Sequence, residues 1–157
     1  MPPLAGAPVR VDLVHGLRDR HGPVHAGAFL RERRIALNCT HAEFPRIFVH
    51  EVAHFIWLRL GNPARLRYED IVSAEIASRA RGELGWSAEW RKNALSSHDF
   101  AGRTRHWREY CCESFCDTAA WLYSGTKRHN EFTLGERWRR GRRAWFAESI
   151  ENRTLSI

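Results

Sequence analysis

The sequence has no long hydrophobic run. Its longest nearly continuous apolar stretch, residues 47–58, is interrupted by His50, Glu51 and His54. A membrane-spanning helix needs about 18 or more consecutive apolar residues, so a membrane span is excluded. Residues 1–10 also lack a basic start followed by an apolar segment, which a standard secretion signal requires. We therefore expect a cytoplasmic protein that does not contact a membrane.

Cysteine is scarce, with four residues in 157. Cys111, Cys112 and Cys116 lie close together and Cys39 lies apart, unlike the dispersed pattern of a disulfide-stapled domain. Cys112 and Cys116 would lie one helical turn apart, at the long end for a disulfide. Thiolate is a good zinc ligand, but reduced thiols buried among apolar side chains are the favoured interpretation.

Repeats and low-complexity segments are absent as well, which excludes collagen-like and coiled-coil architectures. Hydrophobic residues make up 43% of the chain and charged residues 27%. These values are typical of a folded protein, and the length predicts a single domain over residues 1–157. Only residues 1–10, rich in Pro, Ala and Gly, are expected to be loose. The formal net charge is +7.

Hydrophobic spacing and breaker residues predict an α+β protein, mostly helical with a small N-terminal sheet. Residues 9–14 are expected to form a strand or the start of a helix. A turn is predicted at 21–23, and two short strands or one bent strand within 28–38. Helices are predicted over residues 45–60, 70–81, 87–95 (capped by Ser87), 106–124 and 133–150 (opened by a Thr133–Glu136 capping box), with a polar loop over 96–104.

The helix predicted over residues 45–60 carries the clearest chemistry. It is apolar nearly all round apart from His50, Glu51 and His54, and burying these groups without partners would cost several kcal/mol. His50 and His54 are four residues apart, so they share one helical face, where two imidazoles can hold one zinc ion. Glu51 lies about 100° around the helix, beside the metal, where a general base for metal-bound water belongs. The pattern is an H-E-x-x-H motif on a helix.

A third ligand is expected from the helix predicted over residues 106–124. Glu113 and Asp117 are four residues apart on one face of an otherwise apolar segment. The first carboxylate would bind the metal, and the second would accept the other N–H of a ligating histidine and orient its ring. The sequence thus predicts one Zn²⁺ per chain, held by His50, His54 and Glu113.

The run His50-Glu51-Val52-Ala53-His54, followed by Glu113-x-x-x-Asp117, resembles the gluzincin metallopeptidases, and its surroundings are similar to the minimal gluzincins of the ImmA/IrrE type. In that family a strand similar to residues 34–38 precedes a helix similar to 45–54, and a later helix is similar to 112–122. The resemblance implies a zincin-like fold and zinc-dependent hydrolysis of a peptide or protein substrate. It assigns Glu51 as the base that deprotonates the attacking water, and Asp117 as the group that orients His50. The segment between His54 and Glu113 is 58 residues, longer than is usual in the minimal members.

Three other side chains are candidates for the same site. A third histidine from His98 or His106 would instead resemble the SprT-type zinc proteases associated with DNA. Tyr110 precedes Glu113 by three residues and shares its helical face. It is therefore the first candidate for the group that stabilises the oxyanion formed during peptide hydrolysis.

Tyr68, His98 and His106 are further candidates for the oxyanion-stabilising role. The alternative class of function is a non-catalytic or regulatory zinc-binding module, in which a fourth protein ligand such as a cysteine closes the site.

The C-terminal segment 126–157 is basic and aromatic. Its cationic and aromatic residues are Arg137, Arg139, Arg140, Arg142 and Arg143, with Trp138, Trp145 and Phe146. Arginine beside aromatic rings can bind phosphates and stack on bases, so nucleic acid is a conceivable partner. The favoured interpretation is an amphipathic helix that packs Trp138, Trp145 and Ile150 on the core and leaves the arginines in solvent.

Overall fold

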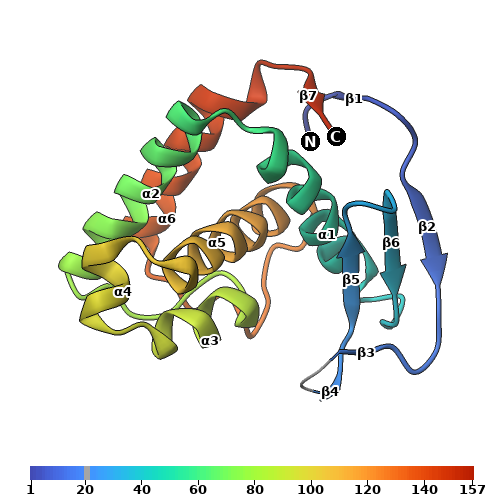
Figure 1. The fold of residues 1–157 in the computed structure, drawn as a ribbon, viewed down its shortest axis with the longest axis horizontal. Coiled ribbons are helices and arrows are strands. Elements are labelled where there is room, and N and C mark those ends of the chain that lie inside the picture. Colours follow the sequence, from blue (N-terminus) through green and yellow to red (C-terminus); the bar gives the residue numbers. More distant parts are fainter. Residues whose placement is uncertain (20–21) are drawn as a thin grey trace.

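Helices make up most of the structure, a computed structural model that describes residues 1–19 and 22–157 (Figure 1). The helices are α1 (Phe44–Arg59), α2 (Asn62–Ala77), α3 (Trp86–Ala94), α4 (Ser97–Gly102), α5 (Arg105–Tyr123), α6 (Glu136–Phe146) and the π-helical turn η1 (Ala147–Glu151). The strands are β1 (Leu4–Ala5), β2 (Arg10–Leu13), β3 (Arg18–Asp19), β4 (Gly22–Pro23), β5 (Ala26–Phe29), β6 (Arg34–Leu37) and β7 (Leu155–Ser156). The predicted fold class, α+β and mostly helical, is confirmed.

A three-stranded sheet lies beside α1 (Figure 1). Its order is β2-β6-β5, with β2 parallel to β6 and β5 antiparallel to it. Residues 9–14 therefore contribute a strand, and the segment 28–38 contributes two strands. Ile35, Ala36 and Leu37 of the central strand are almost completely buried. This apolar strand forms the face on which α1 packs.

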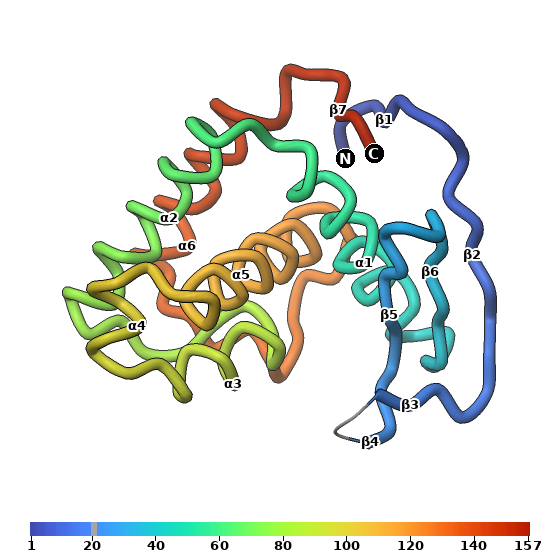
Figure 2. Tube along the Cα trace, viewed as in Figure 1, coloured from blue at the N-terminus to red at the C-terminus, as the bar shows by residue number. Residues whose placement is uncertain are grey.

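The two chain ends lie side by side (Figure 2). Leu4 and Ala5 pair in parallel with Leu155 and Ser156. The expectation that residues 1–10 are loose is therefore wrong for β1 and for Arg10, the first residue of β2, because backbone hydrogen bonds to distant segments order them. Of the turn predicted at 21–23, His21 lies outside the described residues, and Gly22–Pro23 forms β4 opposite β3.

The two helices that were expected to carry the site have nearly the predicted bounds. Helix α1 covers 44–59, where 45–60 was predicted, and Pro45 lies in its first turn, where a missing N–H costs nothing. Helix α5 covers 105–123, where 106–124 was predicted. In Figure 1 α5 runs through the middle of the helical body, with α1 and α3 on either side.

Helix starts were predicted less well. Helix α2 begins at Asn62, directly after α1, rather than at residue 70. Pro63 lies in the first turn of α2, where its missing N–H costs no hydrogen bond. The predicted loop 96–104 contains α4, whose start is closed by reciprocal hydrogen bonds between Ser96 and Asp99.

Two predicted caps are also wrong. Ser87 lies inside α3, which begins after Gly85. Thr133 does not cap α6, because its hydroxyl bonds to the backbone of Glu83 and the helix begins after Gly135.

The C-terminal helix packs on the core through its aromatic residues, as expected. Trp145, Phe146 and Ile150 are buried, and Trp145 and Phe146 contact the rings of Tyr68 and Phe115. Trp138 is only half-buried. The expectation that the arginines stay in solvent fails for Arg142, which is buried, and for Arg139, which is half-buried and donates to backbone carbonyls.

Arg142 is completely buried. Its guanidinium pairs with Glu75 of α2 at 2.6 Å and with Glu83 of the α2–α3 connection at 2.7 Å. A buried cation needs such partners, because an unpaired charge in the interior is very costly. This network ties α6 to α2 across the helical body.

Within residues 1–19 and 22–157, no helix has both the length and the apolar character needed to cross a membrane.

Candidate metal centre

Two histidines of α1 face α5 from successive turns. The ring centroids of His50 and His54 are 5.0 Å apart, and the rings lie at 72° to each other. His50 and Glu51 are buried, and His54 is half-buried. The four-residue spacing on an apolar helix thus brings both imidazoles to one place, as the sequence predicts.

Asp117 fixes the ring of His50. Nδ1 of His50 donates to Oδ1 of Asp117 at 2.8 Å, and Oδ2 of Asp117 accepts the backbone N–H of Ala88 at 3.0 Å. Because Asp117 holds Nδ1, Nε2 is the ring nitrogen of His50 that faces Glu113 of α5. This is the orienting role that the resemblance implies for Asp117.

Glu113 lies close to the Nε2 atoms of both rings. Its Oε2 is 3.3 Å from Nε2 of His50 and 4.0 Å from Nε2 of His54. Its second oxygen, Oε1, is held by the guanidinium of Arg91 at 3.2 Å. One carboxylate oxygen therefore faces both histidines while the other is anchored by α3.

Cys116 is the fourth group at this place. Donor atoms of His50, His54 and Cys116 all lie within 4.8 Å of one another, and these three residues could hold a metal ion. Cys112 is adjacent, with its sulfur 3.5 Å from Nδ1 of His54. The sequence favours buried, purely apolar packing for Cys112 and Cys116. Both sulfurs lie close to the histidines, so apolar packing is only part of their environment.

The pKa values of two carboxyl groups of the centre, Glu113 and Glu51, are shifted in opposite directions. Burial raises the pKa of Glu113, but the hydrogen bond with His50 and the charges of His54 and Arg91 outweigh it and lower that pKa to about 2. Burial raises the pKa of Glu51, and the neighbouring His50 and His54 only partly counteract this. Glu113 is therefore an anion suited to a cation, and Glu51 is the more basic carboxylate.

The remaining sequence candidates lie elsewhere. Tyr110 is fully buried, but its hydroxyl donates to Oε1 of Glu83 at 2.7 Å, so the structure does not bring it to the histidines as an oxyanion-stabilising group. A buried hydroxyl turns to the strongest acceptor within reach, which here is the Glu83 carboxylate. Tyr68 contacts Ser114 and Thr118. His98 and His106 are exposed, and His106 lies beside Asp99.

Sequence reasoning missed two supporting residues, Gly85 and Arg91. Arg91 is an ordinary polar position on an amphipathic helix, and no sequence pattern connects it to Glu113, 22 positions away. Gly85 lies against the Asp117 carboxylate, so closely that a Cβ there would overlap it. Both contacts arise because α3 packs on α5.

Replacing Gly85 by alanine is expected to weaken metal binding by about 10–100-fold, because the new methyl group displaces Asp117 from His50. Its backbone is extended, so the effect is steric rather than conformational. Isothermal titration with Zn²⁺ measures the affinity. Gly141→Ala is the matched control, since its Cβ meets nothing within 4 Å. Unchanged affinity in Gly85→Ala would show that Asp117 does not control His50.

No protein-family model, curated protein or solved structure matches this chain. The resemblance to gluzincins therefore rests only on the residues of β6, α1 and α5.

Proposed function

We propose that this protein is a zinc-dependent metallopeptidase with a zincin-like fold. The observation that carries the proposal is the convergence of three donor atoms, Nε2 of His50, Nε2 of His54 and Oε2 of Glu113. His50 is additionally oriented by Asp117, which is a recurring feature of metal-binding histidines.

One of the two separations between Glu113 and the histidines matches a tetrahedral zinc site. With zinc–ligand distances near 2.0–2.1 Å, two ligands of a tetrahedral site lie about 3.3 Å apart. The observed separations from Glu113 are 3.3 Å and 4.0 Å. Two imidazoles and one carboxylate are also a ligand set of catalytic zinc sites, which leave one position for water.

Each side chain then has a distinct task in peptide hydrolysis. When bound, zinc supplies Lewis acidity that makes a water molecule acidic near neutral pH. His50, His54 and Glu113 hold the metal, Asp117 orients His50, and Arg91 leaves one Glu113 oxygen free for the metal. Glu51 takes the proton of the attacking water and can pass it to the leaving amine. Its burial beside the histidines keeps this carboxylate basic.

A closed, regulatory metal site is the second candidate function. The observation that favours it is the position of Cys116, whose sulfur belongs to the same group as His50 and His54. With Glu113 and Cys116 both coordinated, four protein ligands would saturate zinc and leave no place for water. The two candidates therefore differ in the role of a single thiol.

Zinc titration of Glu113→Gln and Cys116→Ser is expected to separate the candidates. Under the peptidase proposal Glu113→Gln loses most of its affinity, because only two protein ligands remain, whereas Cys116→Ser binds zinc nearly as well as the unchanged protein. Asp117→Ala should lose about 10–100-fold. Cys39→Ser and His98→Ala are the matched controls and should behave like the unchanged protein.

Cobalt substitution supplies an independent readout of the thiol. A thiolate–cobalt charge-transfer band that disappears in Cys116→Ser, together with lost affinity in both variants, would establish the closed site and overturn the peptidase proposal. Retained affinity in Glu113→Gln with loss in His98→Ala or His106→Ala would instead establish a three-histidine site.

A further inference from the structure

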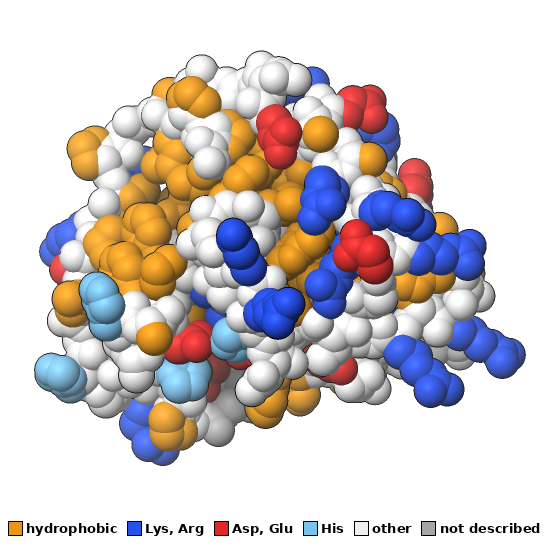
Figure 3. All heavy atoms as spheres, turned by 180° about the vertical axis from the view of Figure 1, so that it is seen from behind, with side chains coloured by type: hydrophobic (Ala, Val, Ile, Leu, Met, Phe, Trp, Pro, Cys, Tyr) orange, Lys and Arg blue, Asp and Glu red, His pale blue; other side chains and the backbone are white. Residues whose placement is uncertain are grey.

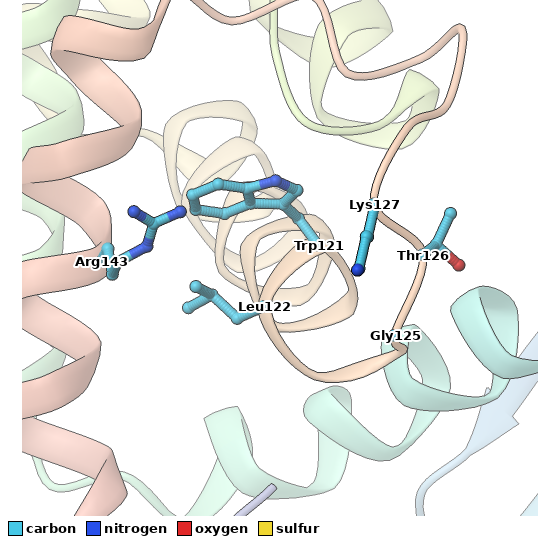
Figure 4. Close-up of a pocket in the computed structure, with 6 residues that line it drawn as sticks. All are labelled: Trp121, Leu122, Gly125, Thr126, Lys127 and Arg143. Carbon is cyan, nitrogen blue, oxygen red and sulfur yellow. The ribbon is translucent and has the colours of Figure 1, made fainter.

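A hollow lies between the end of α5, the loop that follows it and α6, and it shares no residue with the metal centre (Figure 4). Its volume is about 380 Å³, within the range of small-ligand sites. Its lining residues are Trp121, Leu122, Gly125, Thr126, Lys127 and Arg143. Figure 4 shows the cationic side chains of Arg143 and Lys127 on either side of the Trp121 indole. The hollow thus combines a flat aromatic surface with two cationic ends.

An arginine–tryptophan contact is repeated next to this hollow. The guanidinium of Arg143 lies 4.7 Å from the centre of the Trp121 ring, and that of Arg137 lies 4.6 Å from the Trp138 ring. Both tryptophans pack against one small buried cluster. That cluster consists of Leu84, Phe132 and Leu134. The two contacts are therefore neighbours on one surface.

We call this region the α6 basic surface; it consists of Lys127, Arg128, Arg137, Arg140 and Arg143 with Trp121 and Trp138. All five cationic residues are exposed, and among the described residues none of them forms an ion pair with a carboxylate. Arg46, Arg91 and Arg142, by contrast, are all paired. Seen from behind, Lys and Arg side chains gather on the half of the molecule that holds α2 and α6 (Figure 3).

We propose that the α6 basic surface binds single-stranded nucleic acid, with a base against Trp121 in the hollow and flanking phosphates on Arg143 and Lys127. Unpaired cations next to stacking surfaces are what a single strand requires, because it presents alternating phosphates and exposed bases. The repetition of the arginine–tryptophan contact matches a ligand with a repeating structure better than it matches one small anion. This proposal is independent of the peptidase proposal.

Other occupants fit the surface less well. In duplex DNA the bases are stacked on each other, so the Trp121 ring would have no base to receive. A membrane surface calls for exposed apolar side chains among the cations. Among the described residues, the large exposed apolar side chains lie outside α6, for example Trp86 and Trp90 of α3.

Fluorescence anisotropy with a labelled oligothymidine tests the proposal. Binding is expected, with intrinsic tryptophan fluorescence quenched. With about five phosphate contacts, affinity should fall about 100-fold between about 50 and 200 mM salt. The double variant K127A/R143A should lose at least about tenfold in affinity, because it removes both cationic ends of the hollow. Trp121→Leu should lose about tenfold or more through lost stacking, with folding checked by thermal melting.

The matched control is the double variant R18A/R31A, which removes two exposed arginines on the sheet side of the molecule. It should bind oligothymidine like the unchanged protein, which shows that net charge alone does not determine affinity. Absence of binding, equal loss in both double variants, or equally tight binding of duplex DNA or polyglutamate would overturn the proposal. The last result would identify a non-specific polyanion surface. Zinc content of K127A/R143A should be unchanged.

Discussion

Arg142→Met is expected to lower the free energy of unfolding by about 3–5 kcal/mol and the Tm by about 6–20 °C. Arg142 is fully buried between the carboxylates of Glu75 and Glu83. Burial raises the pKa of Glu83, and the charge of Arg142 more than reverses this, so that pKa lies below its ordinary range. Removing Arg142 leaves two buried carboxylates without their main counter-charge. Thermal and urea unfolding followed by circular dichroism measure the loss.

Arg140→Met is the control for this experiment. It makes the same chemical change two residues away, at an exposed position of the same helix, and should change stability by no more than about 0.5 kcal/mol. Adding Glu75→Gln and Glu83→Gln to Arg142→Met should recover part of the loss, because neutral amides are less costly to bury. A loss below about 1 kcal/mol in Arg142→Met would contradict the buried network.

Glu51→Gln is expected to reduce peptide hydrolysis by about 10²–10⁴-fold while zinc stays bound. The amide keeps the shape of the carboxylate but cannot accept the proton of the attacking water. Cleavage of a quenched fluorescent peptide mixture measures activity, and elemental analysis measures zinc. Glu148→Gln, the same change at an exposed residue, should leave both unchanged.

Two results would contradict this role of Glu51. Cleavage by Glu51→Gln at a rate comparable to that of the unchanged protein would show that another group is the base. Loss of zinc in Glu51→Gln would show that the carboxylate is a ligand or a structural partner. His54→Ala, which removes a proposed ligand, should lose both zinc and hydrolysis and provides the reference for metal loss.

The sequence by itself determined the parts of this protein that depend on local spacing. The apolar helix with His50, Glu51 and His54, and the later helix with Glu113 and Asp117, were predicted to within one residue at each end. A period of 3.6 residues places side chains four apart on one face whatever surrounds the helix. Positions with weak local signals, such as Ser87 and Thr133, were misjudged: Ser87 lies inside its helix, and the hydroxyl of Thr133 bonds to the backbone of Glu83.

Tertiary structure decided most of what these faces meet. The pairing of Asp117 with His50 was expected from the sequence, whereas that of Arg91 with Glu113, 22 positions apart, and that of Arg142 with Glu75, 67 positions apart, were not. Such contacts depend on how helices dock, and local periodicity carries no information about docking. The same docking turned Tyr110 toward Glu83 and brought Cys116 to the histidines. It also buried Arg142, because a charge enters the interior only where two elements bring it partners.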